Sequence, residues 1–197
     1  MKYLLLIVVL IIGILIYKNR FFMSTPSVIQ SSPTPTQTTN LTYPVAEFKK
    51  RITKKFFGTY VTKKNSPISP EKFTGFHTAV DVEYEDITSN VPVYSIDDGQ
   101  IIYSGPVKGY GGFIAIQYSQ NIGIYGHLQP STLLPNKLIV KKGDTIGILG
   151  TGYSAETDGE RKHLHFAILK GSKLDFRGYV QSESELSLWL NPLTLFP

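Results

Sequence analysis

Cysteine is absent from the 197-residue sequence. Disulfide bonds, thiolate metal ligands and a cysteine nucleophile are therefore excluded, which leaves histidine, aspartate and glutamate as candidate metal ligands. Histidine is also scarce, with four in the whole chain, and none is followed directly by glutamate. The His-Glu-x-x-His signature that zinc proteases place on a helix is therefore missing. The net charge is only +5 and the basic residues are not interleaved with aromatic residues, so we expect no nucleic-acid partner.

The amino-terminal part of the chain does not have the composition of a folded domain. Residues 3–17 form an uninterrupted apolar run flanked by basic residues. A helix of that length spans about 22 Å, short of the hydrocarbon core of about 30 Å, and fits a signal-peptide core or a short anchor. No small-residue cleavage site follows, which favours an uncleaved signal anchor over residues 1–23. Residues 24–44, rich in Ser, Thr and Pro, predict a disordered linker.

A basic segment follows this linker. Seven lysines and arginines lie between positions 45 and 64 against the single acidic residue Glu47. Val45, Phe48 and Ile52 have helical spacing, so a short amphipathic helix leading into a strand at 57–61 is expected. We interpret residues 45–74 as a solvated basic entry segment with the first strand, in preference to a surface that docks on anionic lipid or wall polymer.

The remainder, residues 75–197, reads as short strands separated by glycine-rich turns. Apolar runs at 91–96 and 100–103 flank Asp97-Asp98-Gly99, which predicts a hairpin, and the runs at 113–118 and 124–128 predict a second one. Further strands are expected at 138–140, 145–149 and 162–169. Only residues 183–190 look helical. Without helical crossovers, this pattern predicts a mostly β domain built on a twisted antiparallel sheet.

The strand at 162–169 carries two of the four histidines. His163 and His165 alternate with Leu164 and Phe166, so both imidazoles should lie on one face and the apolar side chains on the other. Upstream, His77 and Asp81 are four residues apart. Fully extended, their Cα atoms would lie about 13 Å apart, too far for one zinc ion, so the segment must bend.

Two histidines and one carboxylate form a catalytic zinc set that leaves a fourth position open. We assign His77, Asp81 and His165 as zinc ligands. His127, at the end of the strand at 124–128, and His163 remain. Both suit proton transfer or hydrogen bonding to a tetrahedral intermediate, because imidazole titrates near neutral pH.

The motifs, in this order, resemble the lysostaphin-type (LytM-like) zinc endopeptidases, which cut peptide bonds in bacterial peptidoglycan. The resemblance implies a twisted antiparallel sheet whose groove holds Zn²⁺ and activates water for attack on an amide carbonyl. It also implies that His77, Asp81 and His165 are the ligands and that His127 and His163 are catalytic. The matching motifs are His77-x-x-x-Asp81, Val91-Pro92-Val93-Tyr94, Asp98-Gly99, Tyr125-Gly126-His127-Leu128, Val140-Lys141-Lys142-Gly143-Asp144, Ile146-Gly147, Gly150-Thr151-Gly152 and His163-Leu164-His165-Phe166.

Two positions depart from the family pattern. Ala79 stands where glycine is frequent, and the loop at 155–162 is longer and more charged than usual, so this loop is a candidate determinant of substrate choice.

The alternative function is a catalytically silent wall-binding or hydrolase-activating module of the same fold. A biotinyl or lipoyl carrier is disfavoured, because the turn at 97–99 has no lysine. A peptidoglycan substrate places the domain outside the cytoplasmic membrane, either anchored to it through residues 1–23 or secreted.

Overall fold

The computed structural model describes residues 41–196. Within them the chain forms twelve short strands, one α-helix and four 3₁₀ turns. The strands are β1 (Tyr60–Val61), β2 (Gly75–His77), β3 (Ala79–Glu83), β4 (Pro92–Tyr94), β5 (Gly99–Val107), β6 (Gly111–Gln117), β7 (Asn121–Leu128), β8 (Ile139–Val140), β9 (Thr145–Ile148), β10 (His163–Lys170), β11 (Tyr179–Val180) and β12 (Trp189–Leu190). The helical segments are η1 (Phe48–Arg51), η2 (Pro130–Thr132), η3 (Ala155–Thr157), α2 (Glu183–Leu186) and η4 (Pro192–Leu195).

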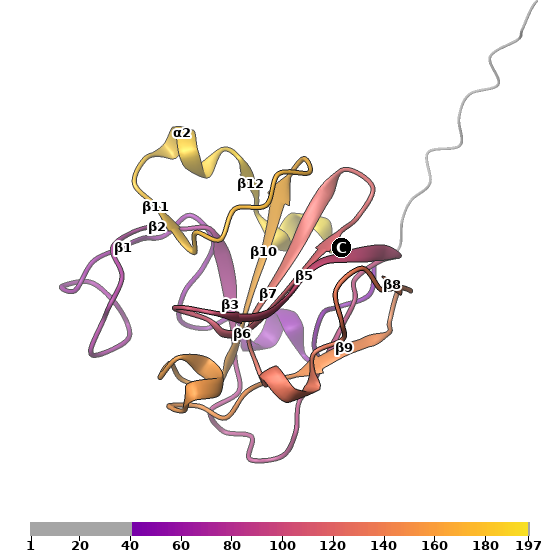
Figure 1. The fold of residues 1–197 in the computed structure, drawn as a ribbon. Coiled ribbons are helices and arrows are strands. Elements are labelled where there is room, and N and C mark those ends of the chain that lie inside the picture. The colour runs from indigo at the N-terminus through magenta and orange to yellow at the C-terminus, as the bar shows by residue number, and fades with distance from the viewer. Residues whose placement is uncertain (1–40, 197) are drawn as a thin grey trace, which may run out of the picture. The chain divides into compact units, whose positions relative to one another are not determined.

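All strand pairs in this part of the chain are antiparallel, and they form three sheets. The largest has the order β12-β10-β7-β6-β5-β8, with β3 pairing with β10 as a branch (Figure 1). The others are β1-β2-β11 and β4-β9. The prediction of a mostly β domain built on an antiparallel sheet is therefore confirmed.

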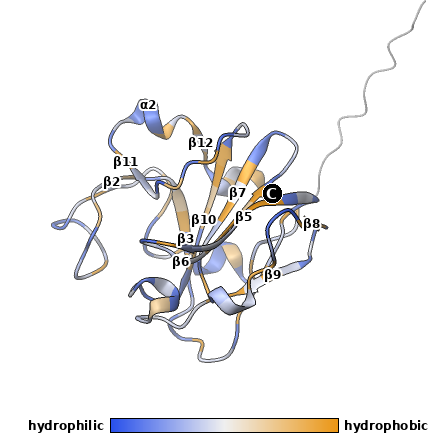
Figure 2. Ribbon diagram, viewed as in Figure 1, coloured by the Kyte–Doolittle hydropathy of each residue, from blue (hydrophilic) through white to orange (hydrophobic). Residues whose placement is uncertain are grey.

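Both faces of the central sheet are covered. Alternation along β10 sends Leu164, Phe166 and Ile168 into the larger apolar cluster and Ala167 and Leu169 into a second one. Figure 2 shows the hydrophobic residues concentrated on the central strands. Strands buried on both faces explain why much of the sequence pattern here is nearly continuous in apolar residues, as in residues 113–116 of β6.

The basic segment at the start of the domain contributes to the larger cluster. Val45, Phe48 and Ile52 are all buried, and Phe48 packs edge-on against Phe166 at 5.7 Å between ring centroids. The expected helix is a single 3₁₀ turn, η1, and the expected strand at 57–61 is limited to β1. The three basic residues of η1 therefore follow Phe48, whose ring packs in the apolar core.

One predicted hairpin is confirmed and the other is wrong. Strands β6 and β7 pair across a tight turn, as expected for the runs at 113–118 and 124–128. Strands β4 and β5 do not pair, because β4 pairs with β9 whereas β5 pairs with β6 and β8. The turn at 97–99 therefore joins strands of two different sheets. The Asp98 carboxylate in this turn accepts hydrogen bonds from the Lys142 backbone N–H and the Lys141 ammonium group, each at 2.9 Å.

The carboxyl-terminal helix is shorter than predicted. Of residues 183–190, only Glu183–Leu186 are helical, capped by the Ser182 hydroxyl, and Trp189–Leu190 form strand β12. Trp189 is buried in the second apolar cluster, and this packing outweighs helical propensity.

None of the helices within residues 41–196 has the length and apolar character that a membrane crossing needs. The predicted anchor at 1–23 and the linker up to Asn40 lie outside the described residues.

Phe166 gives a test of the core. It contacts the rings of Phe48, Tyr125 and Phe196 and is completely buried. We expect Phe166→Ala to lower the free energy of unfolding by about 3–5 kcal/mol, because the change leaves a cavity between packed rings. Phe56→Ala is the matched control: this ring is 45% exposed, and its loss should change stability by no more than about 0.5 kcal/mol. Equal effects in urea denaturation would contradict this core assignment.

Candidate metal centre

The segment from His77 to Asp81 bends, as its spacing requires, because it changes sheets. His77 ends β2 and pairs with Tyr179 of β11, whereas β3 begins two residues later and pairs with β10. Thr78 is fixed at the transition: its N–H donates to the carbonyl of Gly178 and its hydroxyl to that of Arg177, each at 3.0 Å. The change of sheet brings His77 Nε2 to 3.3 Å from Asp81 Oδ1.

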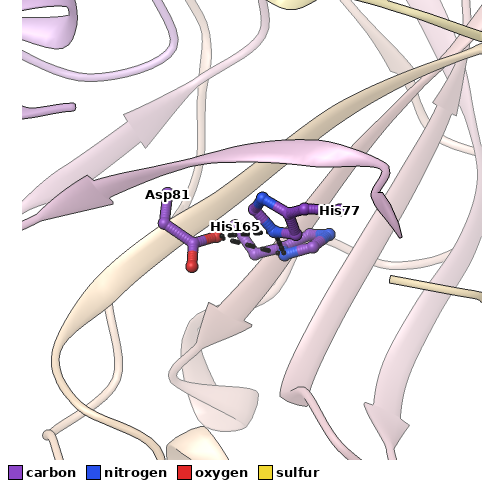
Figure 3. A group of neighbouring side chains, drawn as sticks. All are labelled: His77, Asp81 and His165. Atoms are coloured by element: carbon purple, nitrogen blue, oxygen red, sulfur yellow. Dashed lines mark hydrogen bonds and ion pairs between the residues drawn. The ribbon is translucent and has the colours of Figure 1, made fainter. Parts of the chain in front are cut away.

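A third donor atom completes a small triangle. His165 lies directly opposite Asp81 in the β3–β10 ladder, and its Nδ1 is 3.3 Å from Asp81 Oδ1 and 3.4 Å from His77 Nε2. Figure 3 shows the three side chains pointing toward one another. All three are buried, with exposed fractions of 0–4%, and their donor atoms can meet at one metal ion. The structure thus brings together the three residues that the sequence predicted as ligands.

The dimensions of this triangle fit zinc. Tetrahedral zinc with bonds of about 2.0–2.1 Å holds its donor atoms about 3.3–3.4 Å apart. Asp81 Oδ1 is buried and has no hydrogen-bond partner within residues 41–196, an expensive arrangement unless a cation binds there. His77 Nδ1 lies 3.3 Å from the carbonyl of Phe56, a contact that favours protonated Nδ1 and leaves Nε2 as the donor to a metal.

His127 reaches the same site through a β-bulge. Gly112 and Phe113 of β6 pair with Leu128 and Gly126, so His127 is an extra residue without a partner. Its φ is +64°, a left-handed conformation that is uncommon for a histidine. Strict alternation would place His127 on the same face as Tyr125, in the core. The bulge turns its side chain to the opposite face.

Two backbone carbonyls orient the remaining histidines. His163 Nδ1 lies 2.9 Å from the carbonyl of Arg161, and His127 Nδ1 lies 3.2 Å from that of Thr157. Both contacts favour the tautomer with a proton on Nδ1, and Nε2 of His163 lies 3.4 Å from Asp81 Oδ2. Burial lowers the pKa of His127 to about 3 and that of His163 well below its usual value, so both rings are neutral at pH 7. Their centroids are 4.2 Å apart.

These side chains line a cavity of about 300 Å³ with aromatic walls. Tyr110 stands edge-on to His165 at 5.1 Å between ring centroids, and Tyr179 lies beside His77 at the same distance. The hydroxyl of Tyr179 accepts a hydrogen bond from Lys55, whose ammonium is buried and forms an ion pair with Glu71 at 2.7 Å. A buried ion pair therefore fixes one wall of the cavity.

Sequence reasoning missed the charges behind the donor triangle. Arg161 is 2% exposed and donates to Asp81 Oδ2 at 2.8 Å and to the carboxylate of Glu83. Burial would raise the pKa of Asp81, but the nearby His77, His163 and Arg161 outweigh it and hold that pKa well below its usual value. The sequence offered one signal for these charges. Glu83 lies two residues after Asp81, and Arg161 lies two residues before His163, so strand alternation places each on the same face as a predicted site residue.

Fold and site together define a class: a β-sheet domain with a His-Asp-His donor set and two further histidines in one cavity. The model of peptidase family M23 matches residues 75–176, just over half of the chain. The chain belongs to peptidase family M23, which confirms the resemblance to the lysostaphin-type enzymes. No curated protein matches the chain.

Solved structures with the same fold include the catalytic domain of a peptidase, LytU and a chain of a protein complex. The catalytic domain of the antimicrobial peptidase lysostaphin from Staphylococcus simulans is 22% identical, with a TM-score of 0.52 over 77% of this chain and 97% of that domain. LytU is also 22% identical, with a TM-score of 0.51 over 72% of this chain and 81% of its own. A chain of the SpoIIQ-SpoIIIAH pore forming complex is 17% identical, with a TM-score of 0.54 over 80% of this chain and 90% of its own. At these identities the matches show the fold alone.

Gly112 tests the bulge that places His127. A Cβ atom on Gly112 would lie 2.1 Å from the carbonyl oxygen of Leu128, so Gly112→Ala must displace the bulged backbone. We expect it to cost about 1–3 kcal/mol of unfolding free energy and to shift the His127 ring signals in NMR spectra. Gly147→Ala is the control, because its Cβ would meet only flexible side chains, the nearest at 3.3 Å. An unchanged His127 signal in Gly112→Ala would show that the bulge does not orient this ring.

Proposed function

We propose that this protein is a zinc-dependent endopeptidase that hydrolyses peptide bonds in bacterial peptidoglycan. The observation that carries the proposal is the triangle of His77 Nε2, Asp81 Oδ1 and His165 Nδ1, with edges of 3.3–3.4 Å and a buried oxygen that has no hydrogen-bond partner among the described residues. Membership of family M23 supports the peptidase chemistry.

The three donors leave room for a fourth position that faces the cavity. Zinc held by the three donors would lower the pKa of a water in the fourth position to about 7 and polarise the carbonyl of the bond to be cut. Asp81 supplies one negative charge to the donor set, and the two imidazoles are neutral ligands. Burial of all three donors excludes bulk water and strengthens their electrostatic interaction with a cation.

His127 and His163 are the proposed catalytic residues. Each keeps an unprotonated Nε2 because a carbonyl binds its Nδ1–H, so each is able to accept a proton from an attacking water. Once protonated, the same ring is able to return that proton to the leaving amine. A charged imidazole in this dry site would also stabilise negative charge on the carbonyl oxygen.

The proposed substrate fixes the side of the membrane on which the domain acts. Peptidoglycan lies outside the cytoplasmic membrane, so we propose an extracytoplasmic domain of residues 75–197, preceded by the basic entry segment at 45–74. Of the predicted linker at 24–44, residues 41–44 belong to the domain, because the Thr42 N–H donates to Ile96 and the Pro44 carbonyl accepts from Tyr94. The remainder would act as a spacer, and residues 1–23 as a membrane anchor or a signal peptide.

A second candidate is a catalytically silent module that binds the wall or activates other hydrolases. A chain of the SpoIIQ-SpoIIIAH pore forming complex shares the fold, so this fold also occurs in a protein assembly. Against it stands the complete set of five side chains, with no substitution among the proposed ligands or proton carriers. Metal binding separates the two candidates.

The wild-type protein is expected to bind one zinc ion per chain. His77→Ala and His165→Ala each remove one of three donors and should reduce zinc content to background in equilibrium dialysis followed by metal analysis. His127→Ala leaves the triangle intact and should keep full zinc stoichiometry. A folded wild-type chain that binds no zinc would defeat the proposed function and favour the silent module.

Hydrolysis should depend on a histidine that zinc binding does not need. We expect His127→Ala, fully loaded with zinc, to release peptide fragments from purified peptidoglycan about 10²–10⁴-fold more slowly than wild type. Mass spectrometry of digests from walls of defined cross-bridge composition would identify the cut bond. Equal rates for His127→Ala and wild type would exclude the proposed catalytic role.

A further inference from the structure

The two oxygens of Asp81 have different surroundings. Oδ1 faces His77 Nε2 and His165 Nδ1 and has no hydrogen bond within residues 41–196. Oδ2 accepts a hydrogen bond from Arg161 Nη2 at 2.8 Å and lies 3.4 Å from His163 Nε2. One oxygen is therefore directed toward the donor triangle, and the other is held on the opposite side by a guanidinium group.

Arg161 is itself held by a second carboxylate. Its Nε lies 2.8 Å from Glu83 Oε2 and its Nη2 lies 2.7 Å from Glu83 Oε1, a two-point contact that fixes the plane of the guanidinium. Glu83 lies two residues after Asp81 on β3 and pairs with His163, while Asp81 pairs with His165. The strand ladder thus places each carboxylate opposite one of the two histidines.

Stability alone does not explain this group of three charges. The exposed fractions of the Arg161, Asp81 and Glu83 side chains are 2%, 2% and 10%, and the three carry a net charge of −1, with Lys54 Nζ 3.8 Å from Glu83 Oε2. Removing such ions from water costs several kcal/mol each, and apolar residues of similar volume often give equal or better stability. The geometry that the three charges enforce on Asp81 is the property that apolar residues would not supply.

We propose that Arg161 is a positioning residue, which Glu83 holds in place so that Asp81 offers only Oδ1 to the metal. This inference rests on the zinc centre proposed above. If Asp81 were free to rotate, both of its oxygens could bind the ion, and the second would occupy the position that a catalytic site keeps open. Arg161 prevents this by binding Oδ2, and its rigid planar fork is a geometry that lysine lacks.

Two variants test the fork separately from the charge. Arg161→Lys keeps the positive charge but removes the two-point contact. The double variant Arg161→Gln with Glu83→Gln removes one charge of each sign, so it leaves the net charge unchanged while Asp81 Oδ2 loses its guanidinium partner. We expect both to bind zinc about 10–100-fold more weakly than wild type in competition with a chelator. The visible absorption of their cobalt-substituted forms should weaken, because a second Asp81 oxygen raises the coordination number.

Arg177→Gln is the matched control. Arg177 also forms a fork, with Nε and Nη2 on the Asp175 carboxylate, but its side chain is 45% exposed at the cavity lining and its ion-pair partners, Asp175 and Glu185, are not among the five site residues. This variant should keep wild-type zinc affinity and the wild-type cobalt spectrum.

The outcomes separate the inference from the proposed function. Wild-type affinity and spectrum in both folded test variants would overturn the positioning role and leave the zinc centre standing. A wild-type result for Arg161→Lys alone would also overturn it, because charge without the fork would then suffice. A wild-type protein that binds no metal would overturn the proposed function and, with it, this inference.

Discussion

The pairing register between β3 and β10 is the constraint on which the site depends. It sets His165 opposite Asp81 and His163 opposite Glu83. The same register places Leu164 and Phe166 on the other face, completely buried in the larger apolar cluster. A slip of one residue would send the histidines into that cluster and the apolar side chains into the cavity. The free energy of the core therefore also fixes which polar groups meet.

Two irregularities of the backbone place the site residues that the β3–β10 register alone does not position. A regular strand from His77 to Asp81 would separate their side chains, and the change of sheet at Thr78 brings them together. A regular β7 would turn His127 toward the core. The unpaired residue reverses the alternation, so that Leu128 lies in the cluster that contains Tyr125. The change of sheet brings His77 to the donor triangle, and the bulge brings His127 to the cavity.

The sequence predicts those parts of the site that depend on period and composition. Alternation identified the faces of the strand at 162–169, and a chain with only four histidines made a convergence of His77, His127, His163 and His165 reasonable to expect. Strand pairing was harder, because the Asp97-Asp98-Gly99 turn joins strands of different sheets and its local signal is that of a hairpin. The bulge at His127 depends on contacts between β6 and β7, which no local pattern encodes.

The burial of Arg161 shows a different limit. In the sequence it belongs to a charged loop, and a charged loop predicts solvent exposure, yet the side chain is 2% exposed between two carboxylates. The reason is long-range: both carboxylates come from β3, about eighty positions earlier, and only the ladder with β10 brings them within reach. An arginine without those partners would remain in water, because the cost of burying its charge exceeds what packing its methylene groups returns.

The second face of β10 explains how polar groups stay so dry. At 163 and 165 this face carries imidazoles, and at 167 and 169 it carries Ala167 and Leu169, with Trp189 packed in the same apolar cluster. The cavity is therefore closed on one side by the fold's second core and lined on the other by aromatic rings. Burial of Asp81 and Arg161 strengthens charge interactions, so a cation, a carboxylate and a guanidinium within a few ångströms interact far more strongly than they would at the surface. Small displacements of Asp81 then have large energetic consequences, and a rigid partner on its second oxygen has a physical purpose.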